Sequence, residues 1–459
     1  DVDMVSGAYA AHLADLVRDG TVGIAVVDDA VRRVLETKLR LGLFEQPLTD
    51  PDRAAAVQLT REHRSLARRA AAEAVVLLRN DATLPLRFGT PPVLAGGHVH
   101  LTGPFATARG ELFGTWTLDG HPDDVVSVAD ALMERLAPAG VAVTVDDARF
   151  VDETLVEARA ADLVIACVGE HPLRSGEANS VTSLGLPPGQ LELLEALARV
   201  SARLVVVVVS GRPLALEGLD HLGAALLLVF HPGVEGGHGI VDVLVGDVPA
   251  SGRLPAALPR STGQTPVRHD HLPTGRPLDP DGPVGRYRDE RDTPRYPFGF
   301  GLGYSTVSYG PVELSSSTVA ADGSVTAGAV VTNTGGHPVL ETVQLYVRDV
   351  VAAVSRPVSE LRGARRVHLA PGAQERVEFA IDGALLGYRD AQGHPRQEPG
   401  AFLIRIAPDS DSGDPARLEL LAASDDDHHG PTARTGHAVP SSPKGGRRSA
   451  AATEVALDR

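Results

Sequence analysis

The chain of 459 residues is too long for one ordinary domain, and about 150 residues per domain predicts two or three compact units. Hydrophobic residues make up 43% and charged residues 22%, and no run approaches the roughly 18 apolar residues of a membrane helix, so we expect no membrane partner. The formal charge of -16 repels phosphate backbones, so we expect no nucleic-acid partner either.

The sequence carries no pattern typical of a metal or cofactor site. Cys167 is the single cysteine, which excludes internal disulfides and cysteine-rich zinc sites. The 17 histidines show no HExxH spacing, and the chain has neither a Walker A motif nor a GxSxG elbow. We therefore expect no metal and no cofactor.

Helices are predicted in the first part of the chain. Apolar residues between 24 and 41 recur near helical spacing, with Asp28 and Asp29 as N-cap candidates and Gly42 as the end of the helix. A second helix is predicted from about 60 to 78. The extended stretch at 80–86 that follows it is typical of a connector between domains.

Short apolar runs then alternate with helical patterns up to residue 260. The predicted strands are 98–101, 141–145, 163–168, 204–209 and 224–230, and the predicted helices lie near 124–136, 189–200 and 236–245. Continuous apolar strands separated by helices predict a parallel sheet covered on both faces, which is a three-layer α/β sandwich.

Beyond residue 260 the pattern changes. Residues 261–310 are rich in Pro, Gly and Arg, as in a loop that wraps domains or lines a site. Apolar residues then alternate with a period of two between turn signals, for example at Val343, Leu345 and Val347, which predicts an antiparallel β-sandwich. From about Ser424 the chain has hardly any apolar residues, so we expect a disordered tail.

The first candidate for a site is the loop after the predicted strand 163–168, because parallel sheets place their sites at the carboxyl ends of strands. It carries two carboxylates, Glu170 and Glu177, and either can supply a general acid. On residue type alone, a solvated loop glutamate is the simpler interpretation for both, and a capping or surface histidine is the simpler one for His171. The glycine-rich stretch 231–239 does not have the spacing of a dinucleotide-binding loop.

Eight segments in chain order resemble the C-terminal two-thirds of glycoside hydrolase family 3 enzymes of the bacterial β-glucosidase type. They are LETKLRLGLF at 35–44, AVVLLRNDATLPL at 74–86, residues 169–190, SGRPLAL at 210–216, FHPGVEGG at 230–237, GRLPAALP at 252–259, YPFGFGLGY at 296–304 and VQLYVRDVVAAVSRPVSELRG at 343–363. Short motifs mislead singly, but this many in one order are specific.

The resemblance implies a division of the chain into a β/α-barrel remnant, a connector, an α/β sandwich, a wrapping loop, a fibronectin type III-like domain and a tail. The corresponding residues are 1–50, 51–95, 96–260, 261–310, 311–422 and 423–459. It also implies retaining, exo-acting hydrolysis of a terminal β-glucoside or other β-linked oligosaccharide, with an Asp nucleophile from the barrel. By its position in the motif, Glu177 corresponds to the family's acid/base, whereas Glu170 has no such counterpart.

Two departures from the family pattern stand out. Ser180-Val181 stands where the family usually has Ser-Arg. The opening residues, Asp1 to Met4, resemble the segment shortly after the nucleophile and contain no leader, so the nucleophile and most of the barrel are expected to be missing. Neither Asp1 nor Asp3 is a candidate nucleophile, and we expect these residues alone to be catalytically silent.

Two alternatives remain. One is a non-catalytic carbohydrate-binding or scaffold protein, which the low aromatic content of 4% and the single tryptophan, Trp116, disfavour. The other is an enzyme whose barrel is encoded separately and acts as a partner. In either case, an apolar stripe is expected on the helix that bears Val27, Val31 and Val34, because nothing in the chain is predicted to cover it.

Overall fold

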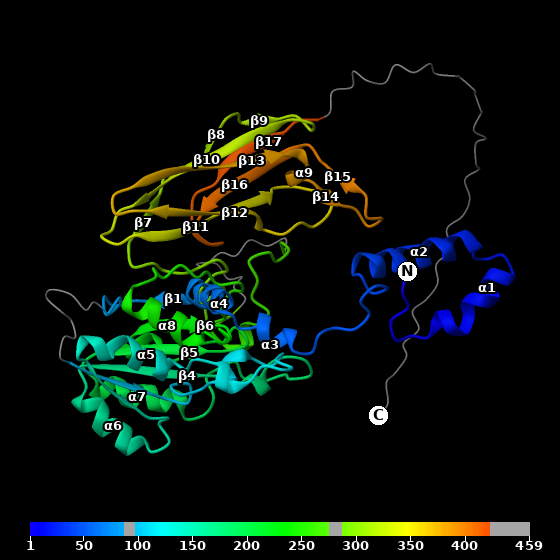
Figure 1. Cartoon of the computed structure of the whole chain (residues 1–459). Coiled ribbons are helices and arrows are strands. Elements are labelled where there is room, and N and C mark those ends of the chain that lie inside the picture. Colours follow the sequence, from blue (N-terminus) through cyan, green and yellow to red (C-terminus); the bar gives the residue numbers. More distant parts are fainter. Residues whose placement is uncertain (87–96, 275–286, 423–459) are drawn as a thin grey trace, which may run out of the picture.

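The computed structural model describes residues 1–86, 97–274 and 287–422. This part of the chain forms an α/β domain, a β-sandwich above it and a short helical segment at the N-terminal end (Figure 1). The predicted disordered tail lies outside the described residues.

The α/β domain is built on a six-stranded sheet in the order β1-β6-β5-β4-β2-β3. Its strands are β1 (Val76–Arg79), β2 (His98–Thr102), β3 (Ala142–Val145), β4 (Leu163–Gly169), β5 (Leu204–Val209) and β6 (Ala225–Val229). Strands β2 to β6 pair in parallel, while β1 runs antiparallel to β6 at the edge. The predicted three-layer α/β sandwich is confirmed, with a mixed rather than a purely parallel sheet.

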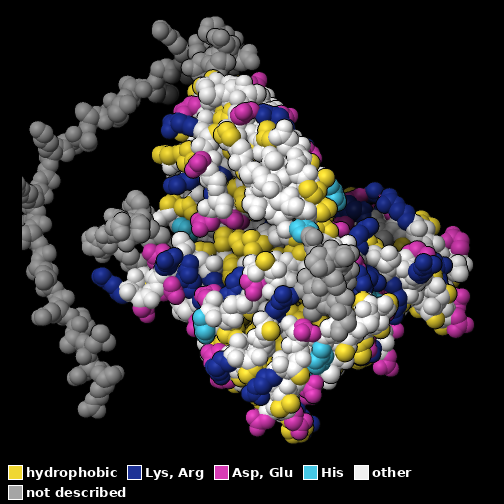
Figure 2. Space-filling model, turned by 90° about the vertical axis from the view of Figure 1, so that its left-hand side faces the viewer, with side chains coloured by type: hydrophobic (Ala, Val, Ile, Leu, Met, Phe, Trp, Pro, Cys, Tyr) yellow, Lys and Arg dark blue, Asp and Glu magenta, His cyan; other side chains and the backbone are white. Residues whose placement is uncertain are grey.

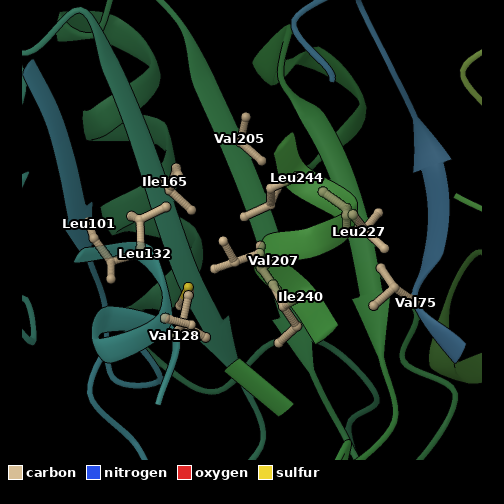
Figure 3. Close-up of a cluster of buried hydrophobic side chains, with 14 of the residues drawn as sticks. Val75, Leu101, Val128, Leu132, Ile165, Val205, Val207, Leu227, Ile240 and Leu244 are labelled. Carbon is tan, nitrogen blue, oxygen red and sulfur yellow. The ribbon is translucent and has the colours of Figure 1, made fainter. Parts of the chain in front are cut away.

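Helices cover both faces of this sheet (Figure 1). One face packs against α4 (Arg61–Ala74), α5 (Val128–Leu136) and α8 (Gly236–Val245), and the other against α6 (Val151–Ala160) and α7 (Gln190–Val200). Because side chains alternate along a strand, Val205 and Val207 of β5 belong to the first core cluster and Val206 to the second. Figure 3 shows the first cluster, in which Leu132 of α5 and Ile240 of α8 face the strands.

Two expectations about helices are wrong, and one helix was not predicted. The predicted helix 60–78 is too long, because α4 ends at Ala74 and the apolar run that follows pairs with β6 as strand β1. Helix α6 was not expected, since its polar sequence buries only Thr154 and Ala158. Helix α2 (Ile24–Arg40) begins after Gly23, so Asp28 and Asp29 lie inside it and cap nothing, and Asp29 instead pairs with Arg33 one turn later.

The second domain is the predicted antiparallel sandwich, apart from one short edge strand, Thr318–Val319, that pairs in parallel. One sheet joins β13, β10 and β7 in that order with β8 beside β10, and the other has the order β12-β11-β16-β17-β9. The strands are β7 (Val307–Tyr309), β8 (Glu313–Leu314), β9 (Thr318–Val319), β10 (Ser324–Asn333), β11 (Val339–Asp349), β12 (Glu360–Leu369), β13 (Gln374–Asp382), β16 (Gly400–Ala407) and β17 (Ala416–Leu420). Helix α9 (Gly383–Leu386) and the hairpin of β14 (Tyr388–Arg389) and β15 (Pro395–Arg396) complete the domain.

Buried polar contacts fasten the sandwich to the α/β domain. Arg253 Nη2 lies 2.8 Å from Oε2 of Glu341 in the sandwich, and the other oxygen of Glu341 accepts from the Tyr309 hydroxyl of the same domain at 2.8 Å. Gln344 Nε2 donates to the carbonyl of Gly299 at 3.1 Å. On the face shown in Figure 2, hydrophobic side chains gather at the junction of the two domains, where a cleft of about 920 Å³ includes Leu302 in its lining. Residues 299–302 touch both units, because Gly299 accepts from Gln344 of the sandwich and the N–H of Leu302 donates to the carbonyl of Leu77.

The N-terminal segment lies beside this body in Figure 1. It contains a short helical turn (Tyr9–Leu13), α1 (Ala14–Arg18), α2 and α3 (Arg53–Val57). Helix α2 has no buried residue, and Val31 is 51% exposed, but Val27 and Val34 are half-buried, so the expected apolar stripe is exposed only in part. Its apolar side chains and those of α1 line an open groove of about 700 Å³.

Candidate functional site

The carboxyl ends of β4, β5 and β6 lie side by side, because these strands are parallel and in register. The backbone N–H of Glu170 donates to the carbonyl of Val209 at 2.8 Å, and that of Ser210 donates to the carbonyl of Val229 at 3.1 Å. The loops that follow these strands therefore begin at one edge of the sheet, where α/β proteins place their ligands.

Gly169 turns the chain out of β4 at this edge. Its φ is +145°, and a Cβ atom there would lie 1.9 Å from the carbonyl oxygen of Val209. Only glycine avoids this clash, so the strand end can approach β5 closely and direct the next residue inward.

Glu170 is a buried structural carboxylate. Its residue is 2% exposed, and its two oxygens lie 2.8 Å from Arg212 Nε and 3.2 Å from Arg174 Nε. The expectation of a solvated loop glutamate is therefore wrong for Glu170, because the loop folds back over the strand end and covers it. Each carboxylate oxygen is already paired with a guanidinium group, so this carboxylate is unsuited to proton transfer with a substrate.

The loop around Glu177 is held by contacts on both sides of that residue. Thr115 Oγ1 lies 2.5 Å from the carbonyl oxygen of Pro172 and 2.9 Å from that of Ser175, and Ser175 is buried. Asn179 Nδ2 donates to the carbonyl of Ser175 at 3.2 Å. These contacts close a tight turn with Glu177 at its outer side.

Glu177 itself is exposed, and its side chain forms no hydrogen bond or ion pair with any residue that the structure describes. Its neighbours Gly176 and Ala178 have φ values of +94° and +61°. A left-handed alanine costs on the order of 1 kcal/mol, so the surrounding contacts must enforce this turn. The arrangement leaves one free carboxyl group at the carboxyl edge of the sheet.

Two histidines lie near the loop. His171 is exposed and its Nδ1 accepts the N–H of Leu173 at 3.2 Å, which confirms the interpretation as a capping or surface histidine. His231, two residues after β6, packs tightly, since a Cβ atom on Gly114 or Gly211 would meet its ring at 2.4 or 2.6 Å. Burial lowers the pKa of His231, although the Glu170 carboxylate opposes this effect. The imidazole is thus neutral near pH 7.

Sequence reasoning missed Thr115, Arg212 and His231 as parts of this site. Arg212 and His231 come within three residues of the ends of β5 and β6, so the rule that pointed to Glu170 applies equally to them. Thr115 gives no comparable signal, because it reaches the loop from a turn far away in the sequence.

The glycines of 231–239 serve packing. A Cβ atom on Gly237 would lie 2.1 Å from the carbonyl oxygen of Ser127, and one on Gly239 would lie 2.6 Å from the Cβ of Ala71. They let α8 approach α4 and α5 closely. This close packing gives the glycines a structural role.

Among residues 1–86, 97–274 and 287–422, no cluster of three His, Cys, Asp or Glu side chains is arranged to hold a metal ion. Cys167 is buried in β4, and burial raises the pKa of its thiol to about 12. In the described part of the chain, none of the helices combines the length and the hydropathy needed to cross a membrane.

Comparison with known proteins agrees with this architecture. Residues 75–304 match the glycosyl hydrolase family 3 C-terminal domain, and residues 341–410 match the fibronectin type III-like domain. The chain is 37% identical over 456 residues to a periplasmic β-glucosidase of Salmonella typhimurium, covering 92% of this chain and 59% of that protein. It is 31% identical to a β-xylosidase of Formosa agariphila, covering 92% of this chain and 60% of that one.

Solved structures give the same relationship. A β-glucosidase from Listeria innocua, solved in complex with isofagomine, superposes with a TM-score of 0.81 at 30% identity, and the match covers 92% of this chain and 59% of that one. The chain thus spans about three-fifths of the length of the relatives that it matches. With its α/β domain and its sandwich both matched, the chain belongs to glycoside hydrolase family 3.

Proposed function

We propose that the chain supplies the acid/base carboxyl group of a retaining exo-glycosidase that acts on terminal β-linked sugars, and that Glu177 is this group. The observation that carries the proposal is the contrast on one loop between a free, exposed Glu177 and a buried, doubly paired Glu170. Glu177 also stands where the family motif places its acid/base.

An acid/base must meet the substrate and change its protonation state during the reaction. It first protonates the leaving oxygen and then removes a proton from the attacking water. The Glu177 carboxyl group is accessible and unpaired among the described residues, so it can do both. Glu170 is covered by its own loop and can do neither.

Retention also needs a nucleophilic carboxylate about 5–5.5 Å from the acid/base. The second carboxylate of this loop, Glu170, is fixed by Arg174 and Arg212. We infer that the nucleophile comes from outside residues 1–459, and that these residues alone do not hydrolyse glycosides. The covered share of the matched relatives, 59% for the first of them, leaves room for such a segment.

The relatives support a β-linked sugar as the substrate. One is named a β-glucosidase and another a β-xylosidase, and the Listeria innocua enzyme has also been solved with glucose. We therefore assign the chain a terminal β-glucoside or a related β-linked oligosaccharide as its substrate class.

A second candidate function is carbohydrate binding without catalysis. Trp116 is 70% exposed and directly follows Thr115, which holds the Glu177 loop. An exposed indole offers an apolar face on which the carbon face of a sugar ring can pack. Fluorescence of this single tryptophan would report such binding. This candidate would be favoured if a fusion of this chain to the unmatched part of a relative bound sugar but showed no turnover, and if Glu177→Ala left the binding unchanged.

The proposed role of Glu177 can be tested in an active protein made by fusing this chain to the part of the Salmonella typhimurium β-glucosidase that it does not match. Glu177→Ala should slow disaccharide hydrolysis on the order of 10²–10⁴-fold, because a poor leaving group needs its proton. Aryl glycosides with acidic phenols should lose far less. Equal losses for both substrate types would refute the assignment.

A further inference from the structure

Arg212 reaches two parts of the site with one side chain. Its side chain is 18% exposed, and its Nε donates to Glu170 Oε2 at 2.8 Å. Its Nη2 donates to the carbonyl of Arg174 and, at 3.3 Å, to the carbonyl of Asn179. These two carbonyls lie on either side of Glu177 in the chain.

The loop needs such a tie, because it has no regular secondary structure around Glu177. Gly176 and Ala178 adopt left-handed conformations, and the residues from Gly176 to Ser180 are exposed. Glu170 supplies the fixed end of the tie, since it is buried at the end of β4. A planar guanidinium can bind the carboxylate with one nitrogen and the carbonyls with another, which the single nitrogen of a lysine cannot do.

We propose that Arg212 is a positioning residue for Glu177. It ties the loop segments before and after Glu177 to the buried Glu170 carboxylate, and this clamp fixes the position of the acid/base carboxyl group. The inference rests on the proposed role of Glu177. Arg174 provides the matched comparison, because its Nε also contacts Glu170, at 3.2 Å, but its side chain is 42% exposed and forms no hydrogen bond to a loop carbonyl in the described structure.

The clamp can be measured in the 459-residue chain without catalysis. Cys167 is buried and its thiol has a raised pKa, so Glu177→Cys provides the one reactive thiol for a nitroxide label. The Glu177 side chain has no hydrogen-bond or ion-pair partner among the described residues, so this change removes no such interaction there. With Arg212 present, the electron paramagnetic resonance spectrum should show a restricted label. Arg212→Lys should shorten its correlation time severalfold, and Arg174→Gln should leave it unchanged.

Folding is checked in parallel by thermal unfolding. Arg212→Lys keeps the charge opposite Glu170, so the fold should persist. If this variant does not fold, the Glu170→Gln/Arg212→Gln variant removes both buried charges, and its label should be mobile in a folded protein. A restricted label in Arg212→Lys, or in the double variant where Arg212→Lys does not fold, would contradict the clamp. Equal label mobility in Arg174→Gln and Arg212→Lys would also contradict it, because a cation beside the Glu170 carboxylate, and not the bonds to the loop carbonyls, would then order the loop.

A kinetic measurement separates positioning from a purely structural role. In the active fusion, Arg212→Lys should lower kcat for poor leaving groups on the order of 10- to 100-fold, the size of loss expected when a catalytic group is misplaced by about 1 Å. In Arg212→Lys, KM and the rate with acidic phenols should change little. Arg174→Gln should leave kcat, KM and the rate with acidic phenols unchanged. Equal losses for all leaving groups would refute positioning. If the label reports a clamp but Glu177→Ala shows no leaving-group effect, the proposed function fails while the clamp stands.

Discussion

Glu170 and Glu177 belong to one loop yet lie in opposite environments: the Glu170 carboxylate is buried between two guanidinium groups, and the Glu177 side chain is exposed without a partner among the described residues. Their chemistry follows from this difference. A buried, doubly paired carboxylate stabilises the loop, and a free carboxyl group can exchange protons with a substrate. The same residue type therefore serves structure at one position and, in our proposal, catalysis at the other.

Because we propose that the nucleophilic carboxylate comes from outside residues 1–459, the chain alone should not hydrolyse aryl β-glucosides. Release of 4-nitrophenol from its β-glucoside by the purified 459-residue chain should equal the release by its Glu177→Ala variant. Turnover that the substitution removes would mean that a nucleophile within residues 1–459 has been overlooked.

The N-terminal helices should be far less stable than the sheet. Helix α2 buries no residue, whereas Val205 to Val209 of β5 are all buried. Hydrogen exchange followed by mass spectrometry should show exchange of residues 24–40 at least 100-fold faster than that of β5, since local opening of an unsupported helix costs little free energy. Helix α4 should be protected, because it packs on α8 and buries Ala71 and Ala72. Protection of α2 equal to that of β5 would show that its apolar stripe is covered.

The ion pair between Arg253 and Glu341 should matter for stability, because both side chains are almost completely buried at the domain junction. Arg253→Met leaves the Glu341 charge without its partner and should lower the free energy of unfolding by about 3–5 kcal/mol in chemical denaturation. Arg253→Met/Glu341→Gln should recover most of the loss. Arg376→Met, which breaks only exposed pairs, serves as the control and should change little. A single-variant loss no larger than that of the control would contradict this account.

Acid should destabilise the α/β domain through His100. Burial lowers the pKa of this histidine, and the Asp146 carboxylate opposes the effect only in part. The unfolded chain, with a histidine pKa of about 6.5, then binds a proton that the folded chain does not. Stability is therefore full above about pH 6.5 and falls as the pH drops below it. The free energy of unfolding of His100→Gln, measured between about pH 7.5 and 5.5, should fall less steeply than that of the original chain, and equal slopes would contradict the prediction.

Continuous apolar runs made the central strands predictable, and Leu204–Val209 forms β5 as expected. The edge strand β1 was not predictable in the same way. Its residues continue the alanine-rich run of α4, and only their pairing with β6 makes them a strand. Helix α6 was not predicted because it buries too few apolar side chains to give a periodic signal.

The site was predictable in part. The position of its loop follows from the rule for strand ends, and the choice of Glu177 came from the family motif, because residue type alone does not separate it from Glu170. The contacts of Glu170 with Arg212, and of Thr115 with the loop, depend on the strand order of the sheet, which a single sequence does not state.

The most direct test of the central claim is product analysis of the Glu177→Ala variant of the active fusion with azide and an aryl β-glucoside. In the variant, no general base deprotonates the attacking water, so the glycosyl intermediate should accumulate. Azide needs no deprotonation, so it should accelerate turnover and yield the β-glycosyl azide. Glu170→Ala removes the anchor of the Arg212 clamp but leaves the Glu177 carboxyl group in place, so its rescue and its yield of azide product should be far smaller than those of Glu177→Ala. Azide rescue in Glu170→Ala and not in Glu177→Ala would place the acid/base on the other carboxylate and contradict the account.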